Sequence, residues 1–386
     1  MVAGIWHVAF ALPNVDVRAT NIETDFLAIV SPDDKRVRAE ERTHPQLKFY
    51  LRRFREPFGN RFRPSVLIVK SDAPDTALGI DAAHAFRDAL SLSVICKTAA
   101  RIIPSSNSTG MGILYSDYFD FHPAMLSKDF EHLIVSTFAL TSFNDLNTKF
   151  VGQSSAKLRR HSLRSSDYDA RLFSALVAAW EKVFIIGDTS VAGNRMFRSL
   201  AMSYHACSMP RVDMPLLHDL GPILGAWVSA FEALVHPGGE TNVSFKIVAD
   251  AIDAIPWSER KLQYRRCRVK WRSNRPLQIT IASKIYKRIY DARNKFLHGN
   301  PIGQHDLQVR AQVGHGARKI TDTRFLLNYA PLILRALLLE NLQNRLPPPD
   351  ETSNENIDVD KMSALIIAHM DEREFEEPLR RIVDAN

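Results

Sequence analysis

Three polar side chains with catalytic potential lie close together in the stretch YDARNKFLHGNP, residues 290–301. Cleavage of RNA without a metal needs a group that removes the proton of the 2′-hydroxyl and a group that protonates the leaving 5′-oxygen. It also needs a cation that stabilises the charge developing on phosphorus. His298 can transfer protons, and Arg293 can hold a phosphate. We therefore interpret Arg293, Asn294 and His298 as the catalytic residues of a metal-independent reaction that uses no cofactor.

The position of this cluster matches the end of a helix. Residues 278–298 have a helical period, with one apolar stripe formed by Ala282, Ile285, Tyr286, Ile289 and Phe296. Gly299 suits the left-handed position after a helix, and Pro301 prevents continuation. We expect His298 in the last turn, where the negative end of the helix dipole favours the imidazolium. Asn294 lies four residues earlier on the same face, and Arg293 lies at the edge of the stripe.

One histidine cannot easily occupy both sides of a phosphate, so we expect two copies of this site to face each other across a homodimer. The spacing alone does not identify a site, because an arginine again precedes a histidine by five positions at Arg310 and His315. If the residues only end a helix, His298 caps carbonyl groups and Arg293 neutralises an acid. The surrounding sequence therefore has to discriminate between these interpretations.

A second helix is predicted over residues 216–235, from one apolar stripe that ends at Pro237 and Gly238. Glu232 lies on or beside this stripe, where an unpaired carboxylate would be unfavourable. We expect Arg293 to be its partner, so that Glu232 orients Arg293 and supports both folding and cleavage. A purely structural ion pair is an equally good interpretation of Glu232.

The two helices together resemble the HEPN superfamily, and most closely its ApeA-like branch. In that branch a helix with Trp and Glu ends in Pro-Gly and precedes a helix that ends in Tyr-x-x-Arg-x-x-x-x-His-Gly. The residues that match are Trp227, Glu232, Pro237 and Gly238 in the first motif and Tyr290, Arg293, His298 and Gly299 in the second. The resemblance covers residues 169–346. It implies a helical bundle, dimerisation through the catalytic helices, endoribonuclease activity and a role in toxin or antiphage defence systems, with Tyr290 as a supporting residue.

A basic run from Arg260 to Arg275 contains no acid and has Tyr264 and Trp271 interleaved. Such a segment suits backbone phosphates, with aromatic rings for unpaired bases. We predict that it binds RNA through Arg265, Arg266, Arg268, Lys270, Trp271 and Arg272. A solvated loop or a dimer contact would produce the same composition.

The hydrophobic period divides the chain into regions. Residues 1–150 mix strand-like and helical runs, which indicates an α+β domain; residues 151–168 have the Ser- and Arg-rich composition of a linker. Residues 169–346 are expected to form an all-α bundle of the HEPN type, and residues 347–386 a Pro-rich acidic linker with a short helix that docks or stays mobile. Strands are expected at 5–12, 26–30, 65–69 and 133–140, and helices at 80–99, 169–184, 194–207, 244–255, 323–346 and 360–383.

Composition restricts the class of protein. The 386 residues are 45% hydrophobic and carry a formal charge of +7, which is compatible with a polyanionic partner such as RNA. Cys96, Cys207 and Cys267 are isolated, which argues against disulfides and against a zinc site, and no histidine pair has ligand spacing. The richest apolar stretch, residues 325–342, is interrupted by polar residues and a proline, so we expect a cytoplasmic protein without a membrane span.

The N-terminal region offers no comparable chemistry. Its basic stretch RRFREPFGNRFR, residues 52–63, receives no assignment from the sequence. A sensing or regulatory role, with a trigger or a regulatory protein as partner, follows only from its place ahead of an effector. The alternative to the nuclease is a non-catalytic HEPN module that binds a nucleotide, RNA or a protein.

Overall fold

The computed structural model describes residues 5–18, 21–105, 119–136, 141–146, 150–153, 161–209, 220–239, 241–271, 275–314, 320–343 and 359–384. The chain divides into two compact units. Unit 1 comprises Met1–Arg87, Tyr115–Asp167 and Trp180–Gly187, and unit 2 comprises Asp88–Leu114, Tyr168–Ala179 and Asp188–Asn386. Helices α4 (Ile80–Ile102) and α5 (Ala170–Phe184) each contribute to both units. The chain therefore crosses between units more often than a single linker at 151–168 would allow.

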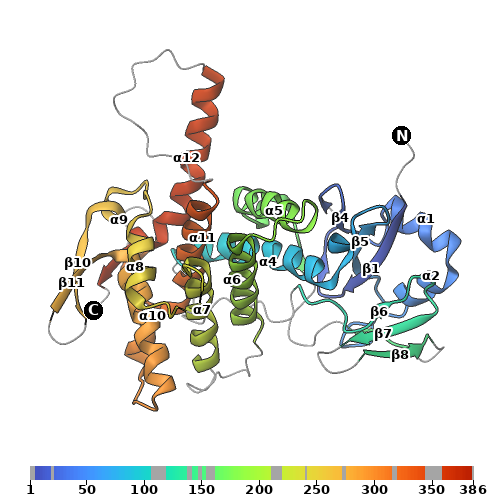
Figure 1. Ribbon diagram of the computed structural model, residues 1–386, viewed down its shortest axis with the longest axis horizontal. Helices are drawn as coiled ribbons and strands as arrows, with labels where there is room; N and C mark the ends of the chain where they lie inside the picture. The colour runs from blue at the N-terminus through green and yellow to red at the C-terminus, as the bar shows by residue number, and fades with distance from the viewer. Residues whose placement is uncertain are drawn as a thin grey trace. The chain divides into compact units, whose positions relative to one another are not determined.

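Unit 1 is built on a four-stranded antiparallel sheet in the order β1-β5-β4-β3 (Figure 1). Its strands are β1 (Trp6–Leu12), β3 (Ile22–Glu23), β4 (Leu27–Val30) and β5 (Ser65–Lys70). The expected strands at 5–12, 26–30 and 65–69 are confirmed. All four residues of β4 are buried, as expected for a strand that has neighbours on both sides and a covered face.

Two helices, α1 (Lys35–Thr43) and α2 (Pro45–Leu51), contribute to the core of unit 1, and α3 (Asp75–Leu78) precedes α4. Side chains from the sheet and both helices form one apolar cluster that includes Val30, Val37, Leu47 and Phe54. A second sheet contains β6 (Met125–Leu126), β7 (His132–Ser136) and β8 (Thr141–Asp145). The expected strand at 133–140 is present as β7, and residues 137–140 lie outside the described part.

Within the predicted linker, residues 154–160 lie outside the described residues, but residues 161–167 have regular structure. Strand β9 (His161–Ser162) pairs in parallel with β2 (Val15–Asp16), and a 3-10 turn, η1, follows at Ser165–Asp167. These residues of the predicted linker therefore have regular structure of their own. Backbone pairing with β2, which the polar composition cannot reveal, holds this segment in unit 1.

Unit 2 has a helical centre. Its helices are α6 (Val191–Ser208), α7 (Leu220–Val235), α8 (Phe245–Asp253), α9 (Arg260–Tyr264), α10 (Ile281–Leu297), α11 (Ala330–Asn341) and α12 (Val359–Arg380). Helix α10 packs against α7 and α8, and α7 packs against α6. A Cβ on Gly221 would lie 3.2 Å from the Phe296 ring, and the rings of Phe231 and Tyr286 are 4.9 Å apart. Helices α7 and α10 therefore run antiparallel and in close contact.

The expectation of an all-α second region is wrong, because unit 2 also contains strands. Strands β10 (Arg266–Trp271) and β11 (Arg275–Thr280) form a hairpin, and β12 (Gln308–Val313), β13 (Ile320–Phe325) and β14 (Ile382–Asp384) form a sheet in the order β13-β12-β14. The predicted helix at 323–346 begins later, at Ala330, after β13 and a 3-10 turn, η4, at Leu326–Tyr329. Pro331 fits the first turn of α11, since a helix needs no N–H there.

The C-terminal segment docks onto unit 2. The carboxylate of Glu374 contacts Lys97 Nζ at 2.6 Å, and Glu376 accepts backbone N–H groups from Ser258 and Glu259 at 3.1 and 2.8 Å. Strand β14 pairs with β12. Of the two possibilities left by the sequence, docking is therefore the one observed for residues 370–383. Among the described residues, no helix combines the length and the apolar character needed to cross a membrane.

Candidate functional site at the end of helix α10

The end of helix α10 has the geometry expected for it. Its start is capped by Thr280, whose hydroxyl accepts the N–H of Ser283 at 3.2 Å. At its end, the N–H of Asn300 donates to the carbonyl of Lys295 at 2.9 Å and that of Gly299 to Phe296 at 3.3 Å. With Gly299 at φ +65°, these bonds form a Schellman motif. The predicted stop at Gly299 is confirmed, and it fixes the backbone of the preceding residue.

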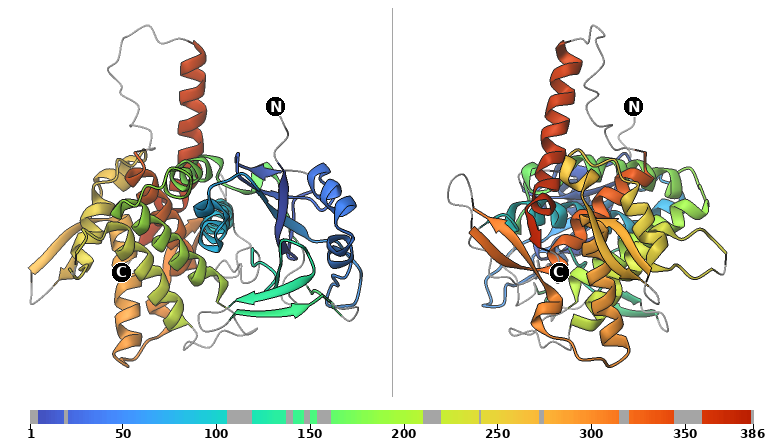
Figure 2. Two further views of the ribbon diagram at one scale, coloured as in Figure 1. Left: turned by 45° about the vertical axis from the view of Figure 1, so that its right-hand side comes forward. Right: turned by 90° about the vertical axis from the view of Figure 1, so that its left-hand side faces the viewer.

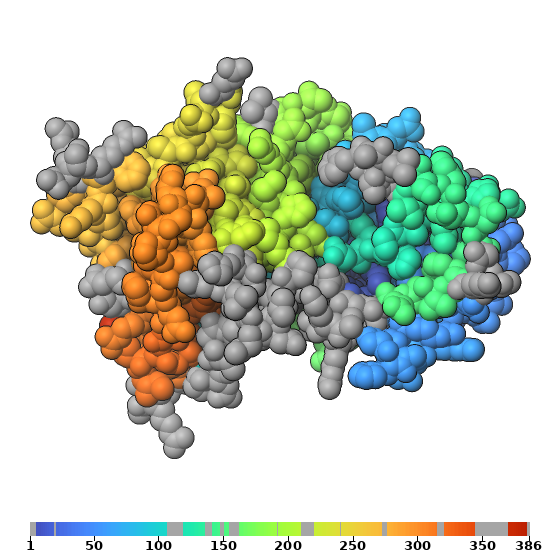
Figure 3. Space-filling view, turned by 90° about the horizontal axis from the view of Figure 1, so that it is seen from below, coloured from blue at the N-terminus to red at the C-terminus, as the bar shows by residue number. Residues whose placement is uncertain are grey.

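His298 is the residue that this motif holds. It is the C-cap residue that directly follows the last helical residue, Leu297, and its N–H donates to the carbonyl of Asn294 at 3.0 Å. Its side chain is exposed, as is the adjacent Leu297 with 62% of its surface accessible. Figure 3 shows the orange residues around this end of α10 uncovered on one face of unit 2. The imidazole is thus accessible to a ligand or to a second copy of the chain.

Arg293 occupies a different environment from His298. It is half-buried, and its Nη1 donates to the side-chain oxygen of Asn294 at 3.0 Å. Its buried Nε has no acceptor in the part of the chain that the structure describes. The structure therefore brings Arg293 and Asn294 together. Five residues along an α-helix correspond to about 140° of rotation and about 7.5 Å of rise, so the backbone positions of Arg293 and His298 lie on different sides of α10.

Glu232 lies on α7 and is half-buried. Burial raises the pKa of its carboxyl group above the ordinary value, and the attraction of Arg293 opposes this shift without cancelling it. No ion pair or hydrogen bond between the two side chains is present in the described part of the chain. The expected direct pairing is therefore not formed, although the two charges interact through space.

Tyr286 is a further polar residue of this region, although the helical period places it only in the apolar stripe of α10. It is fully buried against Phe231 and Phe245. Its hydroxyl nevertheless has no hydrogen-bond partner among the described residues, and burial, together with Glu232 and Tyr290, raises its pKa well above the ordinary value. The presence of a Tyr rather than a Phe at a buried position was the only available signal.

Tyr290, predicted as a supporting residue, is half-buried and belongs to the same aromatic layer. Its ring centroid lies 5.8 Å from that of Phe245 and 6.3 Å from that of Tyr286. Two unsatisfied buried donors, Tyr286 Oη and Arg293 Nε, therefore lie between α7 and α10 beside a half-buried acid. Buried polar groups without partners are uncommon in native proteins and merit a functional explanation.

The basic run forms α9 and the β10–β11 hairpin, which extends from the helices as an arm (Figures 1 and 2). Residues alternate along β10, so that Arg266, Arg268 and Lys270 are exposed on one face while the intervening side chains are half-buried. Arg265 is exposed just before this strand. Four of the predicted RNA-binding side chains therefore lie on the surface of one arm.

Two residues of the predicted RNA-binding set, Trp271 and Arg272, are not among these four side chains. The Trp271 ring lies 4.9 Å from that of Phe245 and is half-buried, so it contributes to packing and the expected stacking surface is not formed on the basic face. Arg272 lies outside the described residues. Tyr264 is the aromatic of this segment that remains on the surface, with 73% exposure, and Arg266 has an acid nearby, Asp253, at 3.8 Å.

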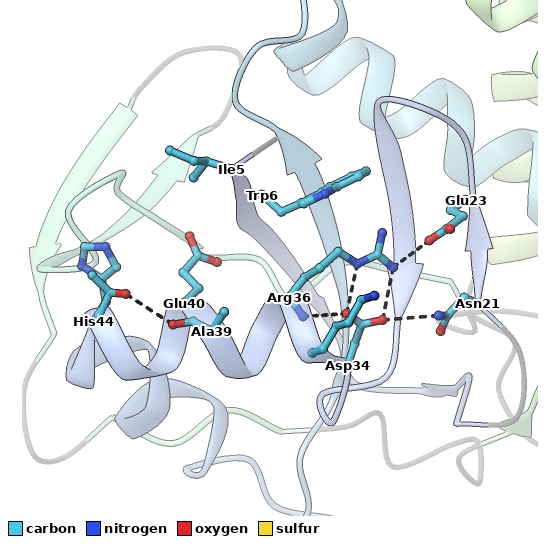
Figure 4. A pocket seen from close by; sticks show the side chains of 11 residues that line it. Ile5, Trp6, Asn21, Glu23, Asp34, Arg36, Ala39, Glu40 and His44 are labelled. Carbon is cyan, nitrogen blue, oxygen red and sulfur yellow. Dashed lines mark hydrogen bonds and ion pairs between the residues drawn. The ribbon is translucent and has the colours of Figure 1, made fainter. Parts of the chain in front are cut away.

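Unit 1 contains a pocket of about 1020 Å³ beside α1 (Figure 4). Four of its charged groups, Glu23, Asp34, Arg36 and Glu40, are already paired within unit 1. Arg36 contacts Glu23 at 2.6 Å and Asp34 at 3.0 Å and lies over the Trp6 ring, and Glu40 accepts the N–H of Val8 at 2.9 Å. Since these contacts stabilise the start of α1, we assign no ligand to the pocket.

One group of potential metal ligands occurs among the described residues: Asp129 and Glu131 in the turn before β7, and His132 at the start of that strand. His132 contacts Asp145 at 3.1 Å, and Asp129 accepts the N–H of Glu131 at 3.0 Å. These contacts explain the group as an exposed, internally hydrogen-bonded turn.

Comparison with known proteins adds no relative, because no family model, no curated protein and no solved structure matches the chain. The similarity to HEPN domains therefore depends on the residues of α7 and α10. Of the first motif, Trp227 is buried within α7, and Pro237 and Gly238 follow the end of that helix at Val235.

Proposed function

We propose that the chain is a metal-independent endoribonuclease of the HEPN type that acts in the cytoplasm as an effector of a toxin or antiphage defence system. One observation carries this proposal. An exposed histidine is held by a Schellman motif at the end of α10, five residues after a half-buried arginine whose Nε lacks a partner. An exposed His298 is what a site completed by a second copy requires.

The proposed reaction is a transesterification. His298 of one copy removes the proton of the 2′-hydroxyl, whose oxygen attacks phosphorus, and the bond from phosphorus to the 5′-oxygen breaks. The second copy of His298 donates a proton to this oxygen, so that the products are a 2′,3′-cyclic phosphate and a 5′-hydroxyl. Arg293 stabilises the charge on the non-bridging oxygens, and Asn294 holds the guanidinium through its side-chain oxygen.

The basic arm provides RNA contacts in this proposal. Exposed cations at Arg265, Arg266, Arg268 and Lys270 can follow a phosphate backbone without reading its sequence, and we include Arg272 in this set from the sequence alone. With Trp271 engaged in packing, the arm supplies charge rather than base stacking. Cleavage should therefore depend strongly on salt.

The alternative is a non-catalytic HEPN module that binds a nucleotide, RNA or a protein partner. It is favoured by the contact of Arg293 with Asn294, since an arginine held in this way can be purely structural. Under either proposal, unit 1 would restrain unit 2 or sense a trigger. Product analysis separates the two proposals.

The deciding experiment incubates purified protein with single-stranded and transfer RNA in EDTA and identifies the product ends. The wild-type chain should cut and leave cyclic phosphate and 5′-hydroxyl ends. His298→Ala should lose about 100-fold or more of the rate, since it removes both proton-transfer groups of the dimer, and Arg293→Ala should also be strongly impaired. His305→Ala is a matched control, because His305 is exposed but lies outside the motif.

Cleavage that persists in His298→Ala, or that needs a divalent metal, would contradict the proposed mechanism. If the wild-type chain and all the variants are inert while RNA is still bound, the non-catalytic module is supported.

A further inference from the structure

A tight turn in unit 1 presents an unusual combination of side chains. Arg55 and Arg61 form an antiparallel bridge, the N–H of Glu56 donates to the carbonyl of Asn60 at 2.9 Å, and Gly59 adopts φ +86°. Phe54 and Phe62, which flank the turn, are buried with ring centroids 6.0 Å apart. The base of the turn is therefore anchored in the core, and its tip is held in a defined conformation.

Phe58 lies at this tip and is 94% exposed, more than any other large hydrophobic side chain in the described part of the chain. An exposed phenylalanine gains nothing from the hydrophobic effect in the free protein. Neither burial nor packing therefore explains its presence at the end of an ordered turn.

The stretch that carries this ring is rich in arginine. Arg52, Arg53, Arg55 and Arg61 are accompanied by one acid, Glu56, within residues 52–61. The carboxylate of Glu56 accepts from the Asn60 amide at 3.4 Å, and it joins no ion pair among the described residues. Arg55 donates to the carbonyls of Arg52 and Phe54, which leaves its charge uncompensated.

Arg63, the next arginine of the stretch, differs from Arg55 because it has acidic partners. Arg63 pairs with Asp33 at 2.9 Å and with Glu41, so its charge is neutralised inside the fold. Loss of solvation lowers the pKa of Arg55, and the neighbouring positive charges of Arg61 and Arg53 lower it further. This crowding of like charges would be relieved by an anion at the turn.

An exposed aromatic ring at the tip of a turn that also carries uncompensated arginine charge matches the requirements of single-stranded nucleic acid. A base can stack on the ring whatever its identity, and guanidinium groups can hold the flanking phosphates. A membrane surface fits less well, because stable attachment needs a larger apolar area than one phenylalanine provides.

We propose that the turn formed by residues 52–61, with Phe58 at its tip, binds single-stranded RNA by base stacking and phosphate contacts. The choice of RNA rather than DNA rests on the proposed function, but the contact itself does not require that α10 cleave anything. The turn would give unit 1 a means of sensing RNA.

The test measures binding of a fluorescein-labelled oligouridine by anisotropy, with the full chain carrying His298→Ala so that the RNA stays intact. Phe58→Ala should weaken binding roughly tenfold through the loss of one stacked base. Arg61→Glu should weaken it further and reduce the dependence on salt. Phe143→Ala and Arg42→Glu are matched controls in unit 1, since both residues are exposed and lie in β8 and α1.

Because the β10–β11 arm also carries positive charge, the same variants are measured in a background with Arg268→Glu. Ultraviolet crosslinking of the bound RNA should label the peptide that contains Phe58. Unchanged affinity for Phe58→Ala and Arg61→Glu in both backgrounds, with no crosslink at this peptide, would overturn the proposal. Loss of binding to phosphatidylserine vesicles in Phe58→Ala, with RNA affinity intact, would overturn it in favour of a membrane.

These results are independent of the nuclease experiment. A protein that binds RNA through Phe58 but never cuts would support the turn and refute the proposed mechanism. A protein that cleaves RNA but binds it equally well without Phe58 would support the proposed mechanism and refute the role of the turn.

Discussion

Two arginines of unit 2 differ in how completely their charge is satisfied. Arg335 is fully buried and donates from Nε to Asp169 and from Nη1 and Nη2 to Glu372, the latter at 2.9 and 3.2 Å. Arg293 is only half-buried, yet it has one hydrogen bond, to Asn294, and an unpartnered Nε. The more buried group is thus the better satisfied one.

The pKa shifts at the two sites differ in the same way as their hydrogen bonding. Burial would lower the pKa of Arg335, but Asp169 and Glu372 raise it above its ordinary value. At the other site burial raises the pKa of Glu232, and the attraction of Arg293 offsets this shift only in part. The first cluster stabilises the charged form of Arg335, whereas the second disfavours the charged form of Glu232. We infer that the first joins α12 to the bundle, while the second retains an unsatisfied arrangement that a ligand can complete.

The largest effect should follow from breaking the Arg335 cluster. Arg335→Met leaves Asp169 and Glu372 buried without their main partner, and removing one member of a buried ion pair costs about 3–5 kcal/mol. Urea unfolding monitored by circular dichroism should show this loss. Arg293→Met, the matched change at the other site, should cost much less because no acid depends on a direct bond to Arg293.

Equal losses in the two methionine variants would remove the distinction between the clusters. Restoration of stability when Asp169→Asn and Glu372→Gln are added to Arg335→Met would confirm that uncompensated charge, rather than lost packing, is responsible.

A smaller effect is expected at the end of α10. Gly299 has φ +65°, and a Cβ there would meet no atom within 4 Å, so Gly299→Ala is penalised only for its left-handed backbone, by roughly 1–2 kcal/mol. Gly299→Asn should lose less. In the alanine variant the rate of cleavage should fall by more than the loss of folded protein explains, because the backbone that holds His298 moves. Activity that tracks stability in both variants would argue against this positioning role.

The smallest effect concerns pH. The pKa of Glu232 is raised in the folded chain above its ordinary value of 4.5. Its carboxylate form therefore opposes folding above that pH, and the stability that the protonated group contributes in acid is lost as the pH rises through the folded pKa. Glu232→Gln should therefore equal or exceed wild-type stability near neutral pH, and this advantage should vanish below about pH 4.5. Unfolding midpoints measured at several pH values test this, with Glu340→Gln as control. A variant less stable than wild type at neutral pH would instead indicate a structural ion pair.

Local patterns predicted the elements that carry the candidate site. The apolar stripe, Gly299 and Pro301 placed the end of α10 correctly, because capping geometry is encoded within a few residues. The same holds for α7 and for the strands β1, β4 and β5, where period and burial agree. The functional meaning of the residues at these positions, including His298 and Arg293, stays a proposal.

The strands of unit 2 were missed for a physical reason. Along β10 the basic side chains alternate with Cys267, Val269 and Trp271, but the density of charge favoured a solvated segment. Strand β14 acquires its structure only by pairing with β12, about 70 residues earlier. Such pairing leaves little signal in either segment taken alone.

By itself, then, the sequence determined the helices around the candidate site, the helix stop after His298 and the positive charge of the arm, since each depends on neighbours in the chain. The tertiary structure decided which charges are satisfied. It paired Arg335 with Asp169 and Glu372 across long separations, kept Glu232 from a direct bond to Arg293, buried the Tyr286 hydroxyl and exposed Phe58. Solvation and partners depend on elements distant in sequence, and only the folded chain brings these together.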